Sequence, residues 1–336
     1  MAAGPGAVPR WNAPFVGIPS FLRSAIVTDL GQLDADIAVL GVPHDEGSPF
    51  MPGSRFGPRG IREHSMRFGG DGRGYYDPGL RREFLAREMA EGRIADVGDA
   101  DVLPTNVVGT FANVTDLARR VLARGALPVV LGGDHGITYP VVRAYEEPLH
   151  VVHFDAHLDY LPFVHGLELT NSHPFRQIAR LAHVVSLTQV GIRSLRNSRL
   201  MMDDSLADGN RVVTMEVLRD TRPAALAASL PEGAACYVSV DIDVLDMALV
   251  PGCVSAEPNG LAYAELRDAL RALAERLRIV GFDLVEVNPM LDVGTGITSY
   301  LAAHTIVEFL GWLCAQPWWT AGRAARRAAR AGAARV

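Results

Sequence analysis

Short apolar runs rich in β-branched residues alternate with helix-patterned segments along most of this 336-residue chain, and this alternation limits the fold more than any other feature. Such alternation is typical of a parallel sheet, because each crossover between parallel strands needs a helix-length connection. We predict strands at 35–42, 126–131, 150–154, 184–190, 211–215, 236–240 and 279–285. We predict helices at 107–123, 139–146, 174–181, 262–276 and 299–313. The sequence therefore predicts an α/β fold with a central, mostly parallel sheet.

The chain divides into one body and two peripheral segments. No internal repeat or linker interrupts residues 26–319, so we predict a single domain there. Residues 1–25 form an N-terminal extension, and we expect its Gly-, Ala- and Pro-rich start to be partly disordered. Residues 320–336 carry five arginines and no acid. We expect this tail to be a frayed or interface-packed basic helix.

Composition excludes several classes of protein. The net charge is −6 and all 32 basic residues are arginines, so we expect no nucleic-acid partner and no lysine-dependent chemistry. Three scattered cysteines and the lack of a secretory signal predict a cytoplasmic protein. The longest apolar stretch, 299–319, contains His304 and Glu308. Ionisable groups at mid-membrane cost roughly 2.5–3.5 kcal/mol each, so we expect a buried helix and no membrane association.

The strongest local motif is His153-Phe-Asp-Ala-His-Leu-Asp159, which continues the predicted strand 150–154. Side chains two apart on an extended chain point the same way, so Asp155, His157 and Asp159 are expected to converge. The carboxyl ends of parallel strands are where open sheets bind ligands. The motif therefore predicts a binding site at that edge.

Two further motifs follow predicted strands. Ser239-Val-Asp-Ile-Asp-Val-Leu-Asp246 places Asp241 and Asp243 two apart, and Leu131-Gly-Gly-Asp-His-Gly-Ile137 presents His135 after a glycine turn. Each piece alone could be a helix cap or a turn. Together they would bring four carboxylates to one partly buried edge, where they would repel one another unless cations neutralised them.

The donor types indicate the metal. Four carboxylates and two imidazoles, with no thiolate, suit Mn²⁺ better than structural zinc. We predict two Mn²⁺ ions per subunit, with Ni²⁺ as the alternative, and a bridging water acidified to hydroxide as the nucleophile. The predicted ligands are His135, Asp155, His157, Asp159, Asp241 and Asp243.

These blocks resemble those of the ureohydrolase family, which includes arginase, agmatinase, guanidinobutyrase and formimidoylglutamase, and they are most similar to its agmatinase-like branch. The similarity runs from about Ala35 to about Phe309 and includes Gly41-Val-Pro-His-Asp-Glu-Gly47 and Gly281-Phe-Asp-Leu-Val-Glu-Val-Asn-Pro289. The resemblance implies a three-layer arginase-like fold and a trimeric or hexameric homo-oligomer. It also implies metal-hydroxide attack on a guanidinium carbon, releasing urea and an amine.

The resemblance also implies roles for single residues. Asp155 and Asp241 would bridge the two ions, and Glu286 would hold the substrate guanidinium through paired hydrogen bonds. Asp246 belongs to the motif Ser239–Asp246, which contains metal ligands, but Asp246 itself is not expected to bind metal. One ion would be bound by His135, Asp155, Asp159 and Asp241, and the other by Asp155, His157, Asp241 and Asp243.

The sequence departs from the family at the proton-transfer histidine. The sequence of this segment is Thr170-Asn-Ser-His-Pro-Phe-Arg176. When its Pro-Phe-Arg is aligned with that of the family, Asn171 falls at the usual histidine position. His173 is our first candidate for the proton carrier and His165 is the second. A third possibility is that neither residue carries the proton.

A second departure concerns the substrate tail. Arginase-type sequences have an acidic stretch where this chain has Ser194 and Arg196, so the α-amino group of L-arginine would lose its partner and is disfavoured. Arg196 could pair with the carboxylate of a guanidino acid or could be a solvated loop residue. The loop Gly252–Gly260 also differs from the family pattern, which disfavours agmatine.

The leading hypothesis is an agmatinase-like amidinohydrolase acting on a small guanidino compound. The alternatives are hydrolysis of guanidine itself, hydrolysis of a formimino C–N bond, or a metal-binding protein without turnover.

Overall fold

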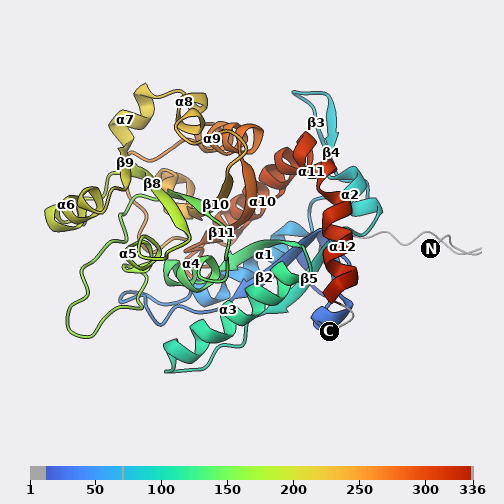
Figure 1. Ribbon diagram of the computed structural model, residues 1–336, viewed down its shortest axis with the longest axis horizontal. Coiled ribbons are helices and arrows are strands. Elements are labelled where there is room, and N and C mark those ends of the chain that lie inside the picture. Colours follow the sequence, from blue (N-terminus) through green and yellow to red (C-terminus); the bar gives the residue numbers. More distant parts are fainter. Residues whose placement is uncertain (1–12, 70–71, 334–336) are drawn as a thin grey trace, which may run out of the picture.

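The computed structural model describes residues 13–69 and 72–333, and it is built on a nine-stranded sheet (Figure 1). The strand order is β1-β5-β2-β6-β11-β10-β7-β8-β9, and all neighbouring strands are parallel. The predicted α/β fold with a parallel sheet is therefore confirmed. The strands are β1 Ala25–Ile26, β2 Ile37–Val42, β5 Ile94–Asp99, β6 Leu127–Gly132, β7 Leu149–Phe154, β8 Val184–Ile192, β9 Arg211–Thr214, β10 Ala235–Asp241 and β11 Arg278–Val285.

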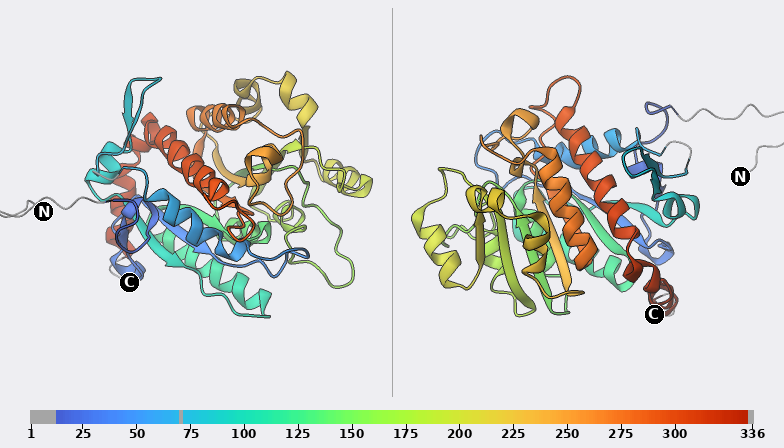
Figure 2. Two further views of the ribbon diagram at one scale, coloured as in Figure 1. Left: turned by 180° about the vertical axis from the view of Figure 1, so that it is seen from behind. Right: turned by 90° about the horizontal axis from the view of Figure 1, so that it is seen from above.

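Helices cover both faces of the sheet (Figure 2). The α-helices are α1 Gly57–Ser65, α2 Ala86–Ala90, α3 Val107–Ala123, α4 Thr138–Val142, α5 Pro174–Ile178, α6 Arg199–Ala207, α7 Met215–Asp220, α8 Pro223–Ala228, α9 Tyr263–Arg276, α10 Ile297–Cys314, α11 Pro317–Ala321 and α12 Arg323–Ala333. A small hairpin joins β3 Tyr75–Asp77 to β4 Arg82–Phe84.

Two hydrophobic cores lie on opposite sides of the sheet. Val129 and Leu131 of β6 belong to the core shared with α1, α9 and α10, whereas Val130 belongs to the core shared with α3, α4 and α5. Alternate side chains of a strand point to opposite faces, so a strand covered by helices on both sides is expected to be apolar at most of its positions. This explains why the predicted strands read as continuous apolar runs.

Every predicted strand and helix is present, with boundaries that differ by a few residues. The prediction missed β5, in which acidic residues interrupt the apolar pattern, and α1, which is largely polar. It also missed α6. The start of the N-terminal extension, expected to be partly disordered, lies outside the described residues. The division at residues 25 and 319 stays a prediction.

The long apolar stretch near the C-terminus forms α10. This helix has the length and composition that could cross a membrane, but 67% of its apolar window is buried inside the protein. Its residues Ala302, Ile306 and Leu310 belong to the core that packs on the sheet. The predicted buried core helix is therefore confirmed.

The parallel arrangement fixes where the polar motifs meet. Strands β6, β11, β10 and β7 are neighbours in the sheet, and each ends in one of the motifs described above. Because all four run in the same direction, their carboxyl ends share one edge.

Candidate metal centre and substrate pocket

His135 follows β6 and its ring is fixed from behind. The hydroxyl of Ser239 donates to Asp283 Oδ1 at 2.6 Å. The oxygen of this Ser239 hydroxyl lies 2.9 Å from His135 Nε2. Since the Ser239 hydroxyl hydrogen is used, its oxygen accepts from Nε2–H. The Nδ1 lone pair then points away from Ser239, toward the acidic motifs.

Carboxylates crowd the exposed lone pair of His135. Nδ1 lies 3.0 Å from Asp155 Oδ2, and 3.2 Å from both Asp159 Oδ2 and Asp241 Oδ2. Their side chains are nearly or fully buried. A lone pair facing three carboxylate oxygens is repulsive unless a cation or a proton lies between them. The donor set therefore fits a divalent cation that prefers oxygen and imidazole ligands.

A second group of donors surrounds His157. Its Nδ1 lies 3.2 Å from Asp155 Oδ1 and 3.1 Å from Asp243 Oδ2. Asp243 is oriented by the Ala156 amide, which donates to Oδ1 at 3.0 Å, and by the Ser255 hydroxyl, which donates to Oδ2 at 3.1 Å. The structure thus brings Asp155 between two groups of donors, one around each predicted histidine ligand.

The ionisation of the cluster reflects this crowding. Burial, followed by the neighbouring Asp243 and Asp155 carboxylates, raises the pKa of Asp241 well above its usual range. Burial and Asp155 raise the pKa of Asp159 to about 6. Burial alone would lower the pKa of His157, but Asp243 and Asp155 outweigh it and raise this pKa to about 12. In the absence of cations the site holds protons, which divalent ions would replace.

Two candidate donors were missed by the sequence analysis. His153 Nε2 lies 2.7 Å from Asp155 Oδ2, so its ring joins the group around His135. Cys253 Sγ belongs to a third group with Asp241 and Asp243. A signal for His153 existed, because it lies two residues before Asp155 on the same strand. Cys253 lies in the loop after β10, ten residues beyond Asp243, and no metal-ligand spacing in its local sequence indicates this role.

Glu286 follows β11 and reaches the same edge. Its backbone has a left-handed φ of 64°, and its Oε1 accepts from the His135 amide at 2.9 Å. Burial and the nearby Asp134 carboxylate raise the pKa of Glu286 to about 8. A planar cation that enters the pocket would strongly stabilise the ionised form of this buried carboxyl group.

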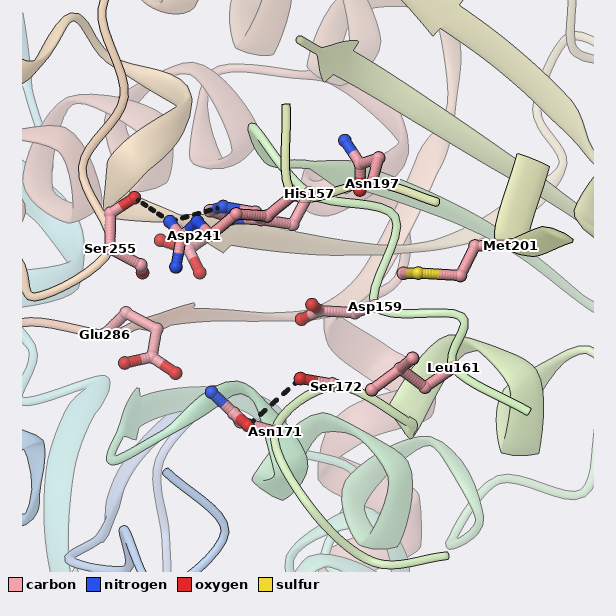
Figure 3. A pocket seen from close by; sticks show the side chains of 11 residues that line it. His157, Asp159, Leu161, Asn171, Ser172, Asn197, Met201, Asp241, Ser255 and Glu286 are labelled. Carbon is pink, nitrogen blue, oxygen red and sulfur yellow. Dashed lines mark hydrogen bonds between the residues drawn. The ribbon is translucent and has the colours of Figure 1, made fainter. Parts of the chain in front are cut away.

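A cavity of about 160 Å³ opens beside these groups (Figure 3). In Figure 3, Glu286 and Asn171 lie on one side of Asp159, and Leu161 and Met201 lie on the other. Acidic groups thus gather at one end of the pocket and apolar side chains at the other. The lining residues are His157, Asp159, Leu161, Asn171, Ser172, Arg196, Asn197, Met201, Asp241, Ser255 and Glu286.

The two histidines proposed as proton carriers lie outside this lining. His173 is 3% exposed, and its Nδ1 lies 2.6 Å from the Thr170 hydroxyl. His165 is exposed. Asn171, which aligns with the usual histidine position, lines the pocket instead.

The loop after β10 contributes a residue that lines the cavity and residues that hold the loop itself in place. Asp246 does not approach the donor groups, and its oxygens accept from the amides of Ala248 and Gly260 at 3.0 Å each. Its expected structural role fits these contacts, because they close the loop that carries Ser255 and Glu257. Glu257 contacts both Ser194 and Arg196, the two departures from the arginase pattern.

Known proteins match the chain over most of its length. A model of the Arginase family matches residues 35–311. The chain is 33% identical to the mitochondrial guanidino acid hydrolase of Homo sapiens, over 92% of this chain and 86% of that protein. It is 35% identical to guanidinopropionase of Pseudomonas aeruginosa, over 88% and 92%. The solved structure of proclavaminate amidino hydrolase from Streptomyces clavuligerus matches with a TM-score of 0.78 and 32% identity, over 90% and 98%.

Proposed function

This chain belongs to the arginase family and is a hydrolase of guanidino C–N bonds, and from that premise we propose how its residues bind metal and substrate. Members of this family depend on a binuclear metal centre. We assign one ion to His135, Asp155, Asp159 and Asp241, and the other to Asp155, His157, Asp241 and Asp243. The observation that carries this assignment is the position of His135 Nδ1, which lies within 3.2 Å of oxygens from three carboxylates.

We propose Mn²⁺ as the resident ion, with Ni²⁺ as the alternative, because oxygen donors dominate the set. When bound, such ions acidify a water molecule and supply a nucleophile near neutral pH. The chain's own residues do the rest. Ser239 holds the His135 ring in the tautomer that leaves Nδ1 free, and Ser255 and the Ala156 amide hold Asp243.

Glu286 is the proposed guanidinium-binding residue. Its carboxylate can accept paired N–H bonds from the substrate, and its Oε1 is already aimed by the His135 amide. The guanidinium carbon would then lie between Glu286 and the carboxylates of Asp159 and Asp241, which line the same cavity. Burial of these groups keeps bulk water from screening the contact.

The leaving amine requires a proton. His173 stays our proposed carrier, and His165 stays the second candidate. Either would need the segment between them to rearrange, because the Thr170 hydroxyl holds His173 and His165 faces solvent. We propose to measure urea release against pH for His173→Asn and His165→Asn separately. The variant that lacks the proton carrier should lose the side of the pH–rate profile that the titration of that histidine produces.

The function is tested by loading the protein with Mn²⁺ or Ni²⁺ and measuring urea and amine release from a panel of guanidino compounds. We expect equal amounts of urea and amine from at least one compound, and no urea from Asp241→Ala. Formamide or ammonia without urea would indicate a formimino hydrolase. Two bound ions with no product from any compound would contradict the proposed hydrolysis.

Cellular location and assembly complete the proposal. We propose a cytoplasmic enzyme, consistent with three free cysteines, and a trimer or hexamer by analogy with the family. Light scattering of the purified chain measures the assembly directly.

A further inference from the structure

Arg196 lies at the rim of the pocket with donors to spare. Its Nη2 donates to the backbone oxygen of Ser255 at 2.8 Å, and its Nε donates to Glu257 Oε1 at 3.0 Å. Within the described part of the chain, its Nη1 has no hydrogen-bond partner, and 59% of the side chain is exposed. A permanently charged guanidinium thus faces the pocket with unused N–H groups.

Glu257 holds Arg196 in place and is itself held. Its Oε1 accepts from the Ser194 hydroxyl at 2.6 Å as well as from Arg196 Nε. Its side chain is 19% exposed, and it is not among the residues that line the cavity. Glu257 Oε1 therefore positions Arg196, and it also lies 3.5 Å from His157 Nε2.

The third contact of Arg196 is with His157, and metal binding to His157 would weaken it. Arg196 Nη2 lies 2.7 Å from His157 Nε2, whereas His157 Nδ1 faces Asp155 and Asp243. An imidazole that offers Nδ1 to a cation keeps its proton on Nε2. Two N–H donors then face each other at 2.7 Å, and the His157 Nε2 proton has Glu257 Oε1 at 3.5 Å as its acceptor. Arg196 Nη2 keeps its contact with the Ser255 oxygen and has one N–H to offer to a ligand.

We infer that Arg196 binds a carboxylate at the tail of the substrate, with Glu257 as its positioning residue, so that the substrate class is guanidino acids. This inference rests on the proposed function, because it concerns the far end of the same substrate. Arg196 is the one side chain of permanent positive charge among the residues that line the cavity. An amine tail would meet repulsion there, and an anionic tail would gain a charge-assisted, bidentate contact.

The test compares tails of equal size and different charge. Urea release is measured for 4-guanidinobutanoate, its carboxamide and (4-aminobutyl)guanidine, with spacers one methylene shorter and longer as well. A charge-assisted hydrogen bond corresponds to a preference of about 10- to 100-fold. We expect the wild type to favour the carboxylate over the carboxamide in kcat/KM by that factor, and Arg196→Gln to bring the ratio close to one.

The matched control is Arg199→Gln. Arg199 carries the same charge three residues away, its side chain is 93% exposed, and its ion pair is with Asp203 on the same helix. This variant should keep the wild-type ratio, and Arg196→Lys should keep part of it because the charge remains without the planar fork. An unchanged ratio in Arg196→Gln, or a wild-type preference for the amine tail, would overturn the inference.

A binding measurement separates this inference from the proposed function. Thermal shifts are recorded with 4-guanidinobutanoate and with its carboxamide, for metal-loaded and metal-free protein, whether or not urea forms. The carboxylate should raise the midpoint in the wild type and in Arg199→Gln more than in Arg196→Gln. Turnover with equal shifts in the variants would contradict the role of Arg196 alone, whereas selective shifts without urea would contradict the proposed hydrolysis alone.

Discussion

At the scale of single residues, the site is defined by side chains whose protons have been assigned by their neighbours. Asp283 accepts the Ser239 hydroxyl hydrogen, Ser239 then accepts from His135 Nε2, and His135 Nδ1 is the ring nitrogen that a cation would contact. This chain of hydrogen bonds begins inside the sheet and ends at the acidic cluster. The tautomer of a proposed metal ligand is therefore fixed by residues that never touch the metal.

Glu286→Gln tests the guanidinium contact. The substitution keeps the size of the side chain and the hydrogen bond from the His135 amide, but it removes the charge that pairs with the substrate. We expect kcat/KM to fall about 10- to 100-fold, since hydrogen bonds to charged groups are worth about 1.5–3 kcal/mol. Metal content should stay at the wild-type level by elemental analysis. Glu216→Gln, an exposed position on α7, is the control, and equal activity of the two variants would refute this role for Glu286.

Local sequence carried much of this residue-scale information. The motif predicted that Asp155, His157 and Asp159 converge, and the structure places them in the cluster. The alternation of strand side chains is not the reason, because β7 ends at Phe154 and Asp159 has a left-handed φ of 46°.

His153, Cys253 and Glu257 were missed. His153 contacts Asp155 two residues away, so its spacing could have revealed it. Glu257 contacts Ser194 and Arg196 more than sixty residues earlier in the sequence, and no spacing rule along one strand reveals such contacts.

At the scale of elements, the cluster forms because four parallel strands end at one edge. Without cations, the raised pKa values of the side chains at that edge favour their protonated forms. Burial and neighbouring carboxylates raise the pKa of Asp134 to about 7 and of Glu286 to about 8, and the pKa of His135 is raised well above its usual 6.5 because three carboxylates outweigh its burial.

These raised pKa values predict how the metal-free protein responds to pH. A group whose pKa is raised by folding stabilises the fold below its unfolded pKa and loses that contribution as pH rises through the folded value. The midpoint of thermal unfolding of the metal-free protein should therefore fall between about pH 6.5 and 8. His153, whose pKa burial lowers to about 4, acts in the opposite sense but only below pH 6.5. Mn²⁺ should remove most of the decline, and a midpoint that rises over this range without metal would contradict this picture.

The close approach of β2 and β6 gives a second prediction at this scale. A Cβ atom on Gly133 would lie 2.0 Å from the backbone oxygen of His44 and 2.6 Å from that of Val42. Gly133→Ala must therefore separate the two strand ends and displace His135. We expect the free energy of unfolding to fall by about 1–3 kcal/mol, with weaker Mn²⁺ binding by calorimetry. Gly294→Ala, where nothing lies within 4 Å, is the control and should behave as the wild type.

At the scale of the whole molecule, the C-terminal helix lies away from the chemistry. Arg326 of α12 stacks on Trp319, with its guanidinium carbon 3.9 Å from the ring centre, and pairs with Asp36 at 3.4 Å. Asp36 precedes β2, so it lies at the edge of the sheet opposite the site.

Removal of residues 323–336 should therefore separate stability from activity. The deletion uncovers Trp319, which is 2% exposed, so the midpoint of thermal unfolding should fall by several degrees. Urea release per folded subunit should change by less than about twofold, because none of the described residues 323–333 lines the pocket. A large loss of activity at an unchanged midpoint would show that the tail takes part in the site.

The fold itself was accessible from sequence where the pattern was strong. Both faces of the sheet are covered, so β6, β7 and β10 read as continuous apolar runs and were predicted to within two residues. β5 was missed because Asp96 and Asp99 interrupt its apolar pattern. Asp96 pairs with Arg62 of α1 at 2.8 Å, a compensation that only the folded structure reveals.

The central claim is that water attacks a guanidinium carbon and that the bond to the substituted nitrogen breaks. It is tested most directly by running the reaction of the Mn²⁺-loaded protein in H₂¹⁸O and analysing both products by mass spectrometry. We expect urea that carries one ¹⁸O atom, together with an equal amount of unlabelled amine. Labelled oxygen in a ureido product with release of ammonia, or the absence of urea, would contradict it.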